Sequence, residues 1–419
     1  MKIAVPRESA SGETRVALTP QAAGQLVGNG VEVLVQAGAG AGSFLSDEAY
    51  REAGATIVPD APALYGQADM VVRVGRPTDE EISFLKPGTI LIGTLGTLAN
   101  PKLAETLAKA GVTAISMDAI PRITRAQSMD TLSSQATVGG YKAVLLAAER
   151  LPKFMPLLTT AAGTVRPARV LVFGAGVAGL MAIGTAKRLG AVVEATDVRP
   201  VVKEQVQSLG GTFLEVEMTD EEKAQAETAG GYAREMSDDY KRRQAELIAS
   251  RVGEADAVIT TALIPGRPAP KLITAEMVKT MRPGSVIVDM AAEMGGNTEL
   301  TEAGKEIVTD NGVRIIGFTN LPATMPGSAT QMYAKNIQTL ISHLVTDGKL
   351  NLDFSDEITA GATITHGGKV VHEATAKALG IEPATPEPAA EPAGTSAKEA
   401  SAKEASAQEA SAQEEKGKS

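Results

Sequence analysis

The chain has 419 residues, 43% of them hydrophobic and 21% charged, so it is long enough for two or three domains at roughly 100 to 200 residues each. It contains no cysteine, which excludes structural disulfides, Cys-ligated zinc, iron–sulfur clusters and thiol nucleophiles. The formal net charge of -10 argues against a nucleic-acid partner, because phosphates are neutralised by basic surfaces, and a small molecule is the expected ligand.

Short apolar runs alternate with segments of helical spacing in two successive stretches of the chain. The first six runs are KIAVP, EVLVQAG, TIVP, MVVRV, TILIGT and TAISMD. The second six are RVLVFGAG, VVEATD, TFLEVE, AVITT, SVIVDM and RIIGFTN. This alternation of strand and helix predicts the α/β class, with two doubly wound Rossmann-like domains and an interdomain cleft.

Two helical stretches connect these sets of strands. Residues 133–158 have helical spacing between the two sets, and residues 329–346 have the apolar spacing of a long helix after them. We expect the second helix to lead the chain back to the first domain. The predicted first domain therefore covers residues 1–132 and is completed by 325–382, and the predicted second domain covers 133–324.

The composition changes abruptly near residue 383. From Ser396 the units SAKEA, SAKEA, SAQEA and SAQE follow in tandem, with almost nothing apolar for a helix to bury. This pattern predicts a disordered low-complexity tail over 383–419. The start, MKIAVPRES, lacks the apolar region and cleavage site of a secretory signal, and glycines interrupt the apolar run 170–186. A cytoplasmic chain is therefore expected.

The sequence RVLVFGAGVAG places glycines directly after a strand and at the start of a helix. Gly174 permits a tight turn, Gly176 lets backbone N–H groups approach a pyrophosphate, and Gly179 allows close packing of helix on strand. Asp197 closes the next strand, where its carboxylate would accept hydrogen bonds from a ribose diol and repel a 2′-phosphate. The pattern predicts a dinucleotide site that prefers NAD to NADP, although Arg199 is a residue type that accommodates such a phosphate.

Two further segments are candidates for the same site. Residues 218–246 form a long charged connection with Gly230 and Gly231 before Tyr232. Two interpretations of it stay open: a loop that closes over a bound nucleotide, and an exposed loop that leads into a charged helix. The segment TTALIPGRP follows the fourth strand of the second set, where ligand contacts gather, so Leu263 is a contact candidate.

A polar segment, residues 118–141, follows the last strand of the first set. Its polar side chains within thirteen positions are Arg122, Arg125, Gln127, Ser128, Asp130, Ser133 and Ser134. One interpretation is a helix N-cap with a solvated loop, since Asp130 and Ser133 are both favourable caps. The other is a polar clamp that reaches across the cleft to the carboxamide and ribose of a nicotinamide.

Histidine is the usual residue that moves a proton while a nicotinamide moves a hydride. The three histidines, His343, His366 and His372, all lie in the last fifth of the chain, away from the expected strand ends. We expect them to be structural or surface residues.

Several motifs together resemble the alanine dehydrogenase and nicotinamide nucleotide transhydrogenase family. They are ETRVALTP, QAGAGAGSFLSDEAY, GAGVAG, TTALIPGRPAPKLI and MRPGSVIVDMAAEMGGN, and the likeness runs from residue 1 to about 380. RITRAQSMD and AGGYAREM resemble the transhydrogenase branch. In alanine dehydrogenases a catalytic lysine and histidine stand where this chain has Gly75 and Gly96, and a carboxylate-binding arginine matches Arg15. The two glycines agree with direct hydride transfer between nicotinamides, which needs no proton on a substrate.

The resemblance also implies site residues. The catalytic set, which would orient the nicotinamide end, corresponds to Arg122, Gln127, Asp130 and Ser133, and Gln127 is expected to touch both the NAD and its redox partner. Arg122 is preferred to Arg125 because the family arginine stands eight residues before the aspartate. Further cofactor contacts are expected at Ser128, Val177, Asp197, Val198, Arg199, Gly231, Gln244 and Leu263, with Tyr232 and Met236 in a mobile loop.

The leading hypothesis is the NAD(H)-binding subunit of a proton-translocating transhydrogenase. Hydride would pass to or from NADP(H) on a partner subunit, coupled to proton movement by a membrane-spanning subunit. The resemblance implies a homodimer attached peripherally to the inner (plasma) membrane through its partners, and the acidic balance gives no reason to expect direct lipid binding. Two alternatives stay open: an alanine dehydrogenase-like amino-acid dehydrogenase, and a non-catalytic NAD-binding regulatory module.

Overall fold

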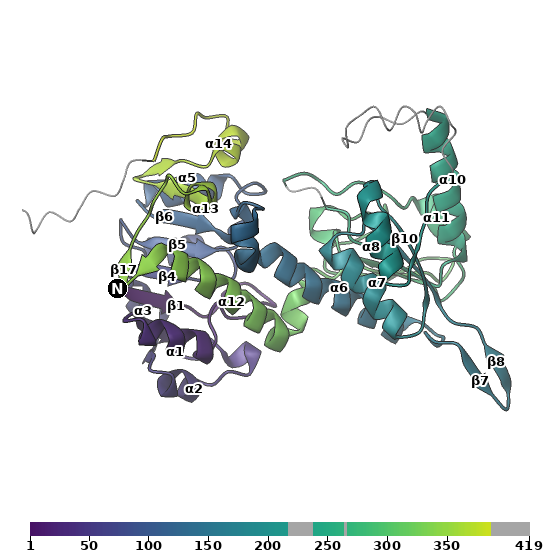
Figure 1. The fold of residues 1–419 in the computed structure, drawn as a ribbon, viewed down its shortest axis with the longest axis horizontal. Helices are drawn as coiled ribbons and strands as arrows, with labels where there is room; N and C mark the ends of the chain where they lie inside the picture. The colour runs from purple at the N-terminus through teal and green to yellow at the C-terminus, as the bar shows by residue number, and fades with distance from the viewer. Residues whose placement is uncertain (217–237, 264–265, 387–419) are drawn as a thin grey trace, which may run out of the picture.

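The computed structural model describes residues 1–216, 238–263 and 266–386, which form two α/β domains joined by two long helices (Figure 1). One domain contains an eight-stranded sheet and the other a seven-stranded sheet. The predicted α/β class with two doubly wound domains is confirmed. The predicted tail lies outside the described residues from residue 387 onward.

The first sheet is parallel except at one edge. Its strands are β1 (Lys2–Val5), β2 (Glu32–Gln36), β3 (Thr56–Val58), β4 (Met70–Val72), β5 (Ile90–Gly93), β6 (Thr113–Ser116), β18 (Thr363–His366) and β19 (Lys369–Val370). They lie in the order β19-β18-β6-β5-β4-β1-β2-β3, with β18 antiparallel to both neighbours. Because the order reverses between β4 and β1, the loops after these two strands meet at one edge of the sheet.

Helices cover both faces of the first sheet. They are α1 (Pro20–Gly28), α2 (Asp47–Glu52), α3 (Ala61–Tyr65), α4 (Asp79–Ser83), α5 (Lys102–Lys109), α12 (Pro326–Leu344), α13 (Glu357–Ala362) and α14 (Glu373–Leu379), with short 3-10 turns η1 (Ala41–Ser43), η2 (Met117–Ala119) and η3 (Thr124–Met129). Ile3 and Val5 of β1 pack with α1 and α12, whereas Ala4 packs on the opposite face with α3 and α5. Successive residues of the strand therefore point to opposite faces of the sheet. Because both faces are buried, apolar residues follow one another without interruption in the sequence.

The second sheet begins at β9 (Arg169–Phe173). Its other strands are β10 (Val192–Thr196), β11 (Thr212–Phe213), β12 (Ala257–Thr260), β13 (Val286–Asp289), β14 (Glu306–Val308) and β15 (Arg314–Ile316), in the order β11-β10-β9-β12-β13-β15-β14. Only the edge strand β14, which the apolar pattern did not predict, is antiparallel within this sheet. The order reverses between β9 and β12, so the loops after these strands define the second switch point.

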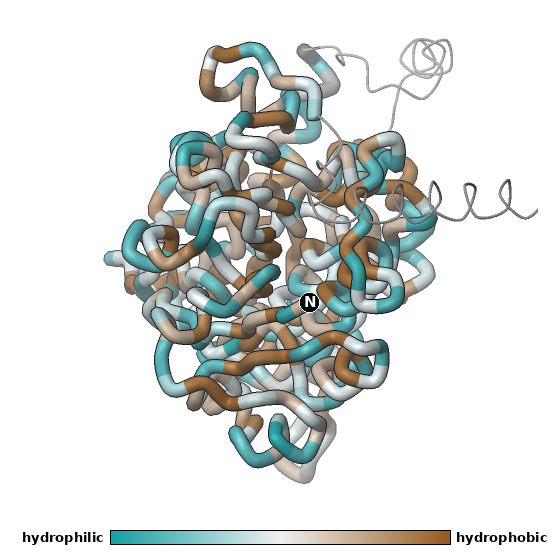
Figure 2. Tube along the Cα trace, turned by 90° about the vertical axis from the view of Figure 1, so that its left-hand side faces the viewer, coloured by the Kyte–Doolittle hydropathy of each residue, from teal (hydrophilic) through white to brown (hydrophobic). Residues whose placement is uncertain are grey.

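The second sheet is also covered on both faces. Its helices are α7 (Val177–Arg188), α8 (Lys203–Ser208), α10 (Asp238–Glu254) and α11 (Ala275–Thr280), with turns η4 (Pro200–Val202), η5 (Ala292–Met294) and η6 (Leu321–Thr324). Val170 and Val172 pack toward α7, and Leu171 and Phe173 toward α10 and α11. Figure 2 shows the resulting apolar segments inside the molecule and the more polar segments around them.

The helix α6 (Thr131–Arg150) runs from the first domain into the second, and α12 brings the chain back. The sequence predicted helical spacing as far as residue 158, but α6 ends earlier because Pro152 forces extended backbone on Leu151 (φ -74°, ψ 127°). A hairpin of β7 (Leu158–Thr160) and β8 (Gly163–Val165) follows and projects from the second domain (Figure 1).

Two smaller features complete the description. A short hairpin, β16 (Val345–Thr346) and β17 (Lys349–Leu350), extends the end of α12. Within the described ranges, no helix has both the length and the apolar character that a membrane span requires.

Candidate functional site

The turn between β9 and α7 requires its glycines. Gly174 has φ +90°, and a Cβ atom there would lie 2.6 Å from Oγ1 of Thr261. A Cβ atom on Gly179 would lie 1.8 Å from the carbonyl oxygen of Gly174, which no side chain could tolerate. The glycine turn, defined as residues 174–179, therefore brings the start of α7 against the carboxyl end of β9, as the spacing of the glycines predicted.

The first turn of α7 fits an anionic ligand. Its N-cap is Gly176, which has no side chain to accept the backbone N–H groups of that turn, and Val177 beside it is exposed. Uncapped N–H groups at a helix N-terminus carry partial positive charge and bind phosphate well. A Cβ atom on Gly176 would fill the approach to this turn, where the Nη2 atom of Arg199 would be its nearest neighbour at 3.8 Å.

Asp197 lies beside the glycine turn, at the carboxyl end of β10. Its Oδ2 atom accepts the backbone N–H of Ala175 at 2.7 Å, and Arg199 donates from Nε to Oδ1 at 3.0 Å and from Nη2 to Oδ2 at 2.9 Å. Burial opposes ionisation, but these hydrogen bonds outweigh it and lower the pKa of Asp197 below its ordinary value. The carboxylate is therefore charged and fixed in direction, and Arg199 lies within reach of whatever Asp197 binds.

Thr261 and Asn297, which were not predicted as site residues, fix the loops that follow β9 and β12. Thr261 donates from Oγ1 to the carbonyl oxygens of Phe173 and Gly174, each at 3.1 Å. The buried Asn297 accepts the N–H of Ala262 at 3.1 Å and donates to its carbonyl oxygen at 2.9 Å. Only their positions in the sequence could have indicated these two residues. Thr261 follows the strand next to β9, and Asn297 belongs to the quoted motif MAAEMGGN.

The loop after β12 also reaches the other domain. Leu263 on this loop is exposed, as a contact residue must be. A Cβ atom on Gly266 would lie 3.3 Å from Cβ of Leu98, which follows β5 in the first domain. The two domains therefore meet near the predicted nucleotide site as well as along α6 and α12.

Of the two interpretations of the polar segment, the structure shows the helix N-cap, and the clamp on a nicotinamide stays a prediction. Asp130 caps α6, because its Oδ1 accepts the N–H of Ser133 at 2.9 Å and its Oδ2 accepts the Ser133 hydroxyl at 2.6 Å. Asn336 donates to the carbonyl oxygen of Ser128 at 2.7 Å. The side chains of Arg122 and Gln127 are exposed and make no hydrogen bond within the stretches of chain that the structure describes. These two side chains are free for a ligand.

Arg125 differs from its neighbour Arg122. Its Nη2 atom donates to Oδ2 of Asp356 at 2.9 Å, and Asp356 is the N-cap of α13. Arg125 therefore fastens the polar segment to the first domain, which agrees with the choice of Arg122 as the candidate.

The helix α6 connects the polar segment to the glycine turn. Asp130 caps its first turn, and ten residues later Gly140 packs against α7 so closely that a Cβ atom would lie 2.1 Å from the carbonyl oxygen of Ala178. The described residues show no hydrogen bond between the polar segment and the glycine turn themselves. Their separation is consequently set by α6 and by the angle between the domains.

The structure describes two of the remaining predicted residues, Gln244 and Val198. Gly231, Tyr232 and Met236 lie outside the described residues. Gln244 is half-buried on α10, and Val198 is exposed beside Asp197.

The histidines are engaged in local structure. Their side-chain partners are Asp356 and Thr359 for His343, Thr113 for His366 and Thr375 for His372.

The switch point of the first domain is occupied by ion pairs. Arg73 is fully buried and donates to Glu8 at 3.2 Å and to Glu81 at 2.9 Å. Burial raises the pKa of Glu8 despite the attraction of Arg73 and the N–H groups of Val74 and Gly75. The buried guanidinium of Arg73 is thus paired within the cluster by two carboxylates.

Gly75 lies beside that cluster, with its N–H donating to Glu8 at 3.3 Å, whereas the N–H of Gly96 donates to Asp118 at 3.3 Å. A Cβ atom on Gly75 would have only Oε2 of Glu8 within 4 Å, at 3.7 Å, and a Cβ atom on Gly96 would have no neighbour within that distance. There is room for larger side chains at both positions, but the left-handed backbone of Gly96 (φ +61°) favours glycine there.

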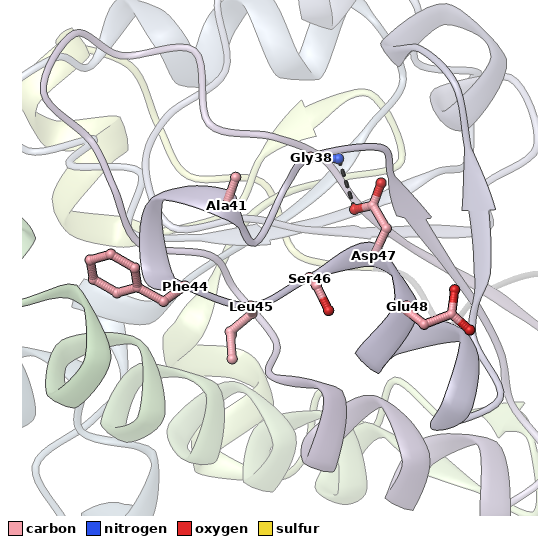
Figure 3. A pocket seen from close by; sticks show the side chains of 7 residues that line it. All are labelled: Gly38, Ala41, Phe44, Leu45, Ser46, Asp47 and Glu48. Atoms are coloured by element: carbon pink, nitrogen blue, oxygen red, sulfur yellow. Dashed lines mark hydrogen bonds between the residues drawn. The ribbon is translucent and has the colours of Figure 1, made fainter.

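The two hollows that the structure shows most clearly lie elsewhere in the first domain. One, of about 510 Å³, is lined by Gly38, Ala41 and residues 44–48, and Phe44 there has a left-handed backbone (φ 60°) and points outward (Figure 3). The other, of about 340 Å³, lies between the start of α1 and the start of α12. No predicted site residue lines either hollow, so we base the site on the glycine turn and its hydrogen bonds.

Comparison with known proteins gives consistent matches. Models of the alanine dehydrogenase/PNT N-terminal and C-terminal domains match residues 4–139 and 143–373. An NAD(P) transhydrogenase subunit alpha protein from Rhodospirillum rubrum is 50% identical over 381 residues, which are 89% of this chain and 98% of that protein. Alanine dehydrogenase from Bacillus subtilis is 32% identical over 389 residues, 91% of this chain and 96% of that protein.

A solved structure agrees with these relatives. The crystal structure of transhydrogenase from Sinorhizobium meliloti matches with a TM-score of 0.81 and 45% identity, covering 88% of this chain and 100% of that one. Together the matches confirm the resemblance drawn from the sequence motifs and the prediction of an oxidoreductase.

Proposed function

Because the chain belongs to the alanine dehydrogenase/PNT family, we propose that it is the NAD(H)-binding subunit of a proton-translocating NAD(P) transhydrogenase. Hydride passes directly between NAD(H) on this chain and NADP(H) on a partner subunit, and a membrane-spanning subunit couples the transfer to proton translocation. The higher identity to a transhydrogenase subunit than to an alanine dehydrogenase supports this branch of the family.

The observation that carries the proposal is at the first switch point. By resemblance, the catalytic lysine and histidine of alanine dehydrogenases are replaced by Gly75 and Gly96. The guanidinium of Arg15 donates to Glu13, Gln135 and Asn320, so it is not free to hold a substrate carboxylate. An amino-acid dehydrogenase must move protons on its substrate, whereas transfer between two nicotinamides needs only their orientation.

Different residues of this chain bind different parts of the dinucleotide. The N–H groups at the start of α7 hold the pyrophosphate, Asp197 accepts from a ribose diol, and Leu263 contacts the cofactor from the loop after β12. Nicotinamide supplies the hydride chemistry when bound. Arg122 and Gln127 orient the nicotinamide end, and the Asp130–Ser133 pair fixes the backbone that carries them.

The partners follow from the same proposal. The chain acts as a homodimer and attaches to the inner (plasma) membrane from the cytoplasmic side through its NADP(H)-binding and membrane-spanning partner subunits. Neither nucleic acid nor direct lipid binding is expected for a chain with a net charge of -10.

The test is hydride transfer from NADH to an NADP analogue by membranes stripped of peripheral protein, with and without the purified chain. We expect transfer that depends on the added chain. Absence of transfer, with a competent NADP(H)-binding partner in the membranes and intact NADH binding, would instead support the regulatory module. Reduction of NAD that depends on alanine would support the amino-acid dehydrogenase.

A further inference from the structure

A buried polar cluster lies where the chain passes from the second domain back to the first. Arg15, from the loop between β1 and α1, donates from Nη1 to Oε1 of Gln135 on α6 at 2.8 Å and from Nη2 to Oδ1 of Asn320 at 3.0 Å. Asn320, just before η6, donates to Oε2 of Glu13 at 2.9 Å. The cluster therefore joins the first domain, the second domain and the helix that connects them.

The ion pair at the centre of the cluster has a fixed geometry. Arg15 donates to both carboxylate oxygens of Glu13, from Nε at 2.8 Å and from Nη2 at 2.6 Å, and the two side chains are only 11% and 5% exposed. Burial opposes ionisation of Glu13, but Arg15 and Asn320 lower its pKa below the ordinary value. Such paired, charge-assisted hydrogen bonds are strongly directional, so the cluster resists rotation.

Asn320 also constrains the backbone where the chain leaves the second domain. Its φ of 51° is left-handed, a conformation that asparagine tolerates better than most residues. Its N–H donates to Oε1 of Glu293 in η5 at 3.1 Å. Asn320 therefore fixes the direction in which the chain leaves the second domain and at the same time bonds to the first domain.

The loop that supplies Glu13 and Arg15 is bonded to the returning helix as well. Thr14 donates to the carbonyl oxygen of Ala323, and the N–H of Val16 donates to Oγ1 of Thr330 on α12 at 3.2 Å. Gln135 donates to the carbonyl oxygen of Ala329 at 3.1 Å. The two helices that connect the domains, α6 and α12, are therefore both hydrogen-bonded to the segment ETRVAL or to each other in this region.

We propose that Glu13, Arg15 and Asn320 form an interdomain pin that fixes the angle between the two domains. On the proposed function, this angle sets the distance between the polar segment, which orients the nicotinamide end, and the glycine turn, which holds the pyrophosphate. Displacements of about 1 Å in reacting groups cost up to about 100-fold in rate. The three residues are therefore positioning residues for hydride transfer, although none of them contacts the nicotinamide.

The first variant is Asn320→Gly, which keeps the left-handed backbone but removes both side-chain hydrogen bonds to the first domain. Its matched control is Asp347→Gly, because Asp347 has the same φ of 51° and lies exposed in the turn between β16 and β17. Arg15→Lys is a second test variant, since it keeps the charge and loses the forked geometry. Arg15→Lys tests the pin without changing the backbone at residue 320.

The first measurement is the distance between the domains. Because the chain has no cysteine, spin labels can be placed at Glu80→Cys on α4 and Glu276→Cys on α11, both exposed, and measured by pulsed dipolar spectroscopy. We expect broader or shifted distance distributions for Asn320→Gly and Arg15→Lys, and the parent distribution for Asp347→Gly. Parent distributions in both test variants would overturn the pin, whatever the activity of the chain.

The second measurement separates positioning from binding. With partner membranes, we expect the two test variants to lose about tenfold or more in hydride transfer while their Kd for NADH stays within about twofold, because the glycine turn is intact. Parent transfer rates despite an altered distance would refute the positioning role. If the parent chain itself supports no transfer with any partner, the proposed function fails, and the spin-label distances still decide on the pin.

Discussion

At the scale of single residues, we propose that Asp197 and Arg199 together determine the preference for NAD over NADP. Asp197 is ionised and held by Arg199, so its charge repels a 2′-phosphate while the arginine is already occupied. We expect Asp197→Asn to weaken NADH binding by about tenfold or more, since hydrogen bonds to charged groups contribute about 1.5 to 3 kcal/mol. The same change should strengthen NADPH binding because it releases Arg199.

Titration of NADH and NADPH fluorescence checks this prediction. The control is Asp197→Asn combined with Arg199→Ala, which should lose the gained affinity for NADPH while NADH binding stays weak. An unchanged ratio of the two affinities in the single variant would contradict the assignment of Asp197 to the ribose.

Gln127 is the residue whose role in the transfer step is most easily isolated. Its side chain is exposed and makes no hydrogen bond among the described residues, so shortening it leaves the fold intact. We expect Gln127→Asn to slow hydride transfer with only a modest loss of NADH affinity, because the side chain sets the approach of the two nicotinamides. Single-turnover transfer and NADH binding give the two quantities.

The arginines of the same segment provide the comparison. Arg122→Gln should also reduce transfer, whereas Arg125→Gln should have little effect because it removes only an exposed ion pair with Asp356. Unchanged turnover in Gln127→Asn would show that the Gln127 side chain has no part in hydride transfer.

At the scale of elements, α6 holds the site together through its contact with α7. Gly140 is required there, because a Cβ atom would overlap the carbonyl oxygen of Ala178 at 2.1 Å. We expect Gly140→Ala to lower the free energy of unfolding by about 2 kcal/mol or more and to weaken NADH binding, because the start of α7 must move.

The neighbouring glycine is the matched control. A Cβ atom on Gly139 would meet only the flexible end of Met290 at 2.8 Å, so Gly139→Ala should be tolerated. Thermal unfolding and NADH titration of both variants test the difference. Equal effects of the two substitutions would show that close packing of α6 on α7 is not what the site depends on.

The elements also show what the sequence could and could not predict. The glycine turn was predictable because its spacing, the preceding strand and Asp197 are all local features. The end of α6 could have been placed from Pro152, whose effect on Leu151 is local as well. By contrast, the partners of Arg15 come from three distant segments, and no local pattern brings Gln135 and Asn320 together.

At the scale of the whole molecule, the two domains have diverged in chemistry while keeping one architecture. Each has a switch point where strand order reverses, between β4 and β1 and between β9 and β12. The second point has the glycine turn, Asp197 and an uncapped helix, which suit a dinucleotide. The first is filled by the buried ion pairs of Arg73 with Glu8 and Glu81. On the proposed function, the first domain contributes to the site through the polar segment and through the angle between the two domains.

The proposed homodimer makes a prediction for the hairpin of β7 and β8. Phe154 and Leu157 beside it are each 58% exposed, and Val165 within it is 37% exposed, which is costly for apolar side chains on a projecting hairpin unless a second copy covers them. We expect the chain to sediment at twice its mass of 43.2 kDa and Leu157→Asp to shift it toward the monomer. Leu350→Asp, an exposed leucine on the β16–β17 hairpin, should leave the dimer unchanged. A dimer that persists in Leu157→Asp and in the double variant with Val165→Asp would place the interface elsewhere.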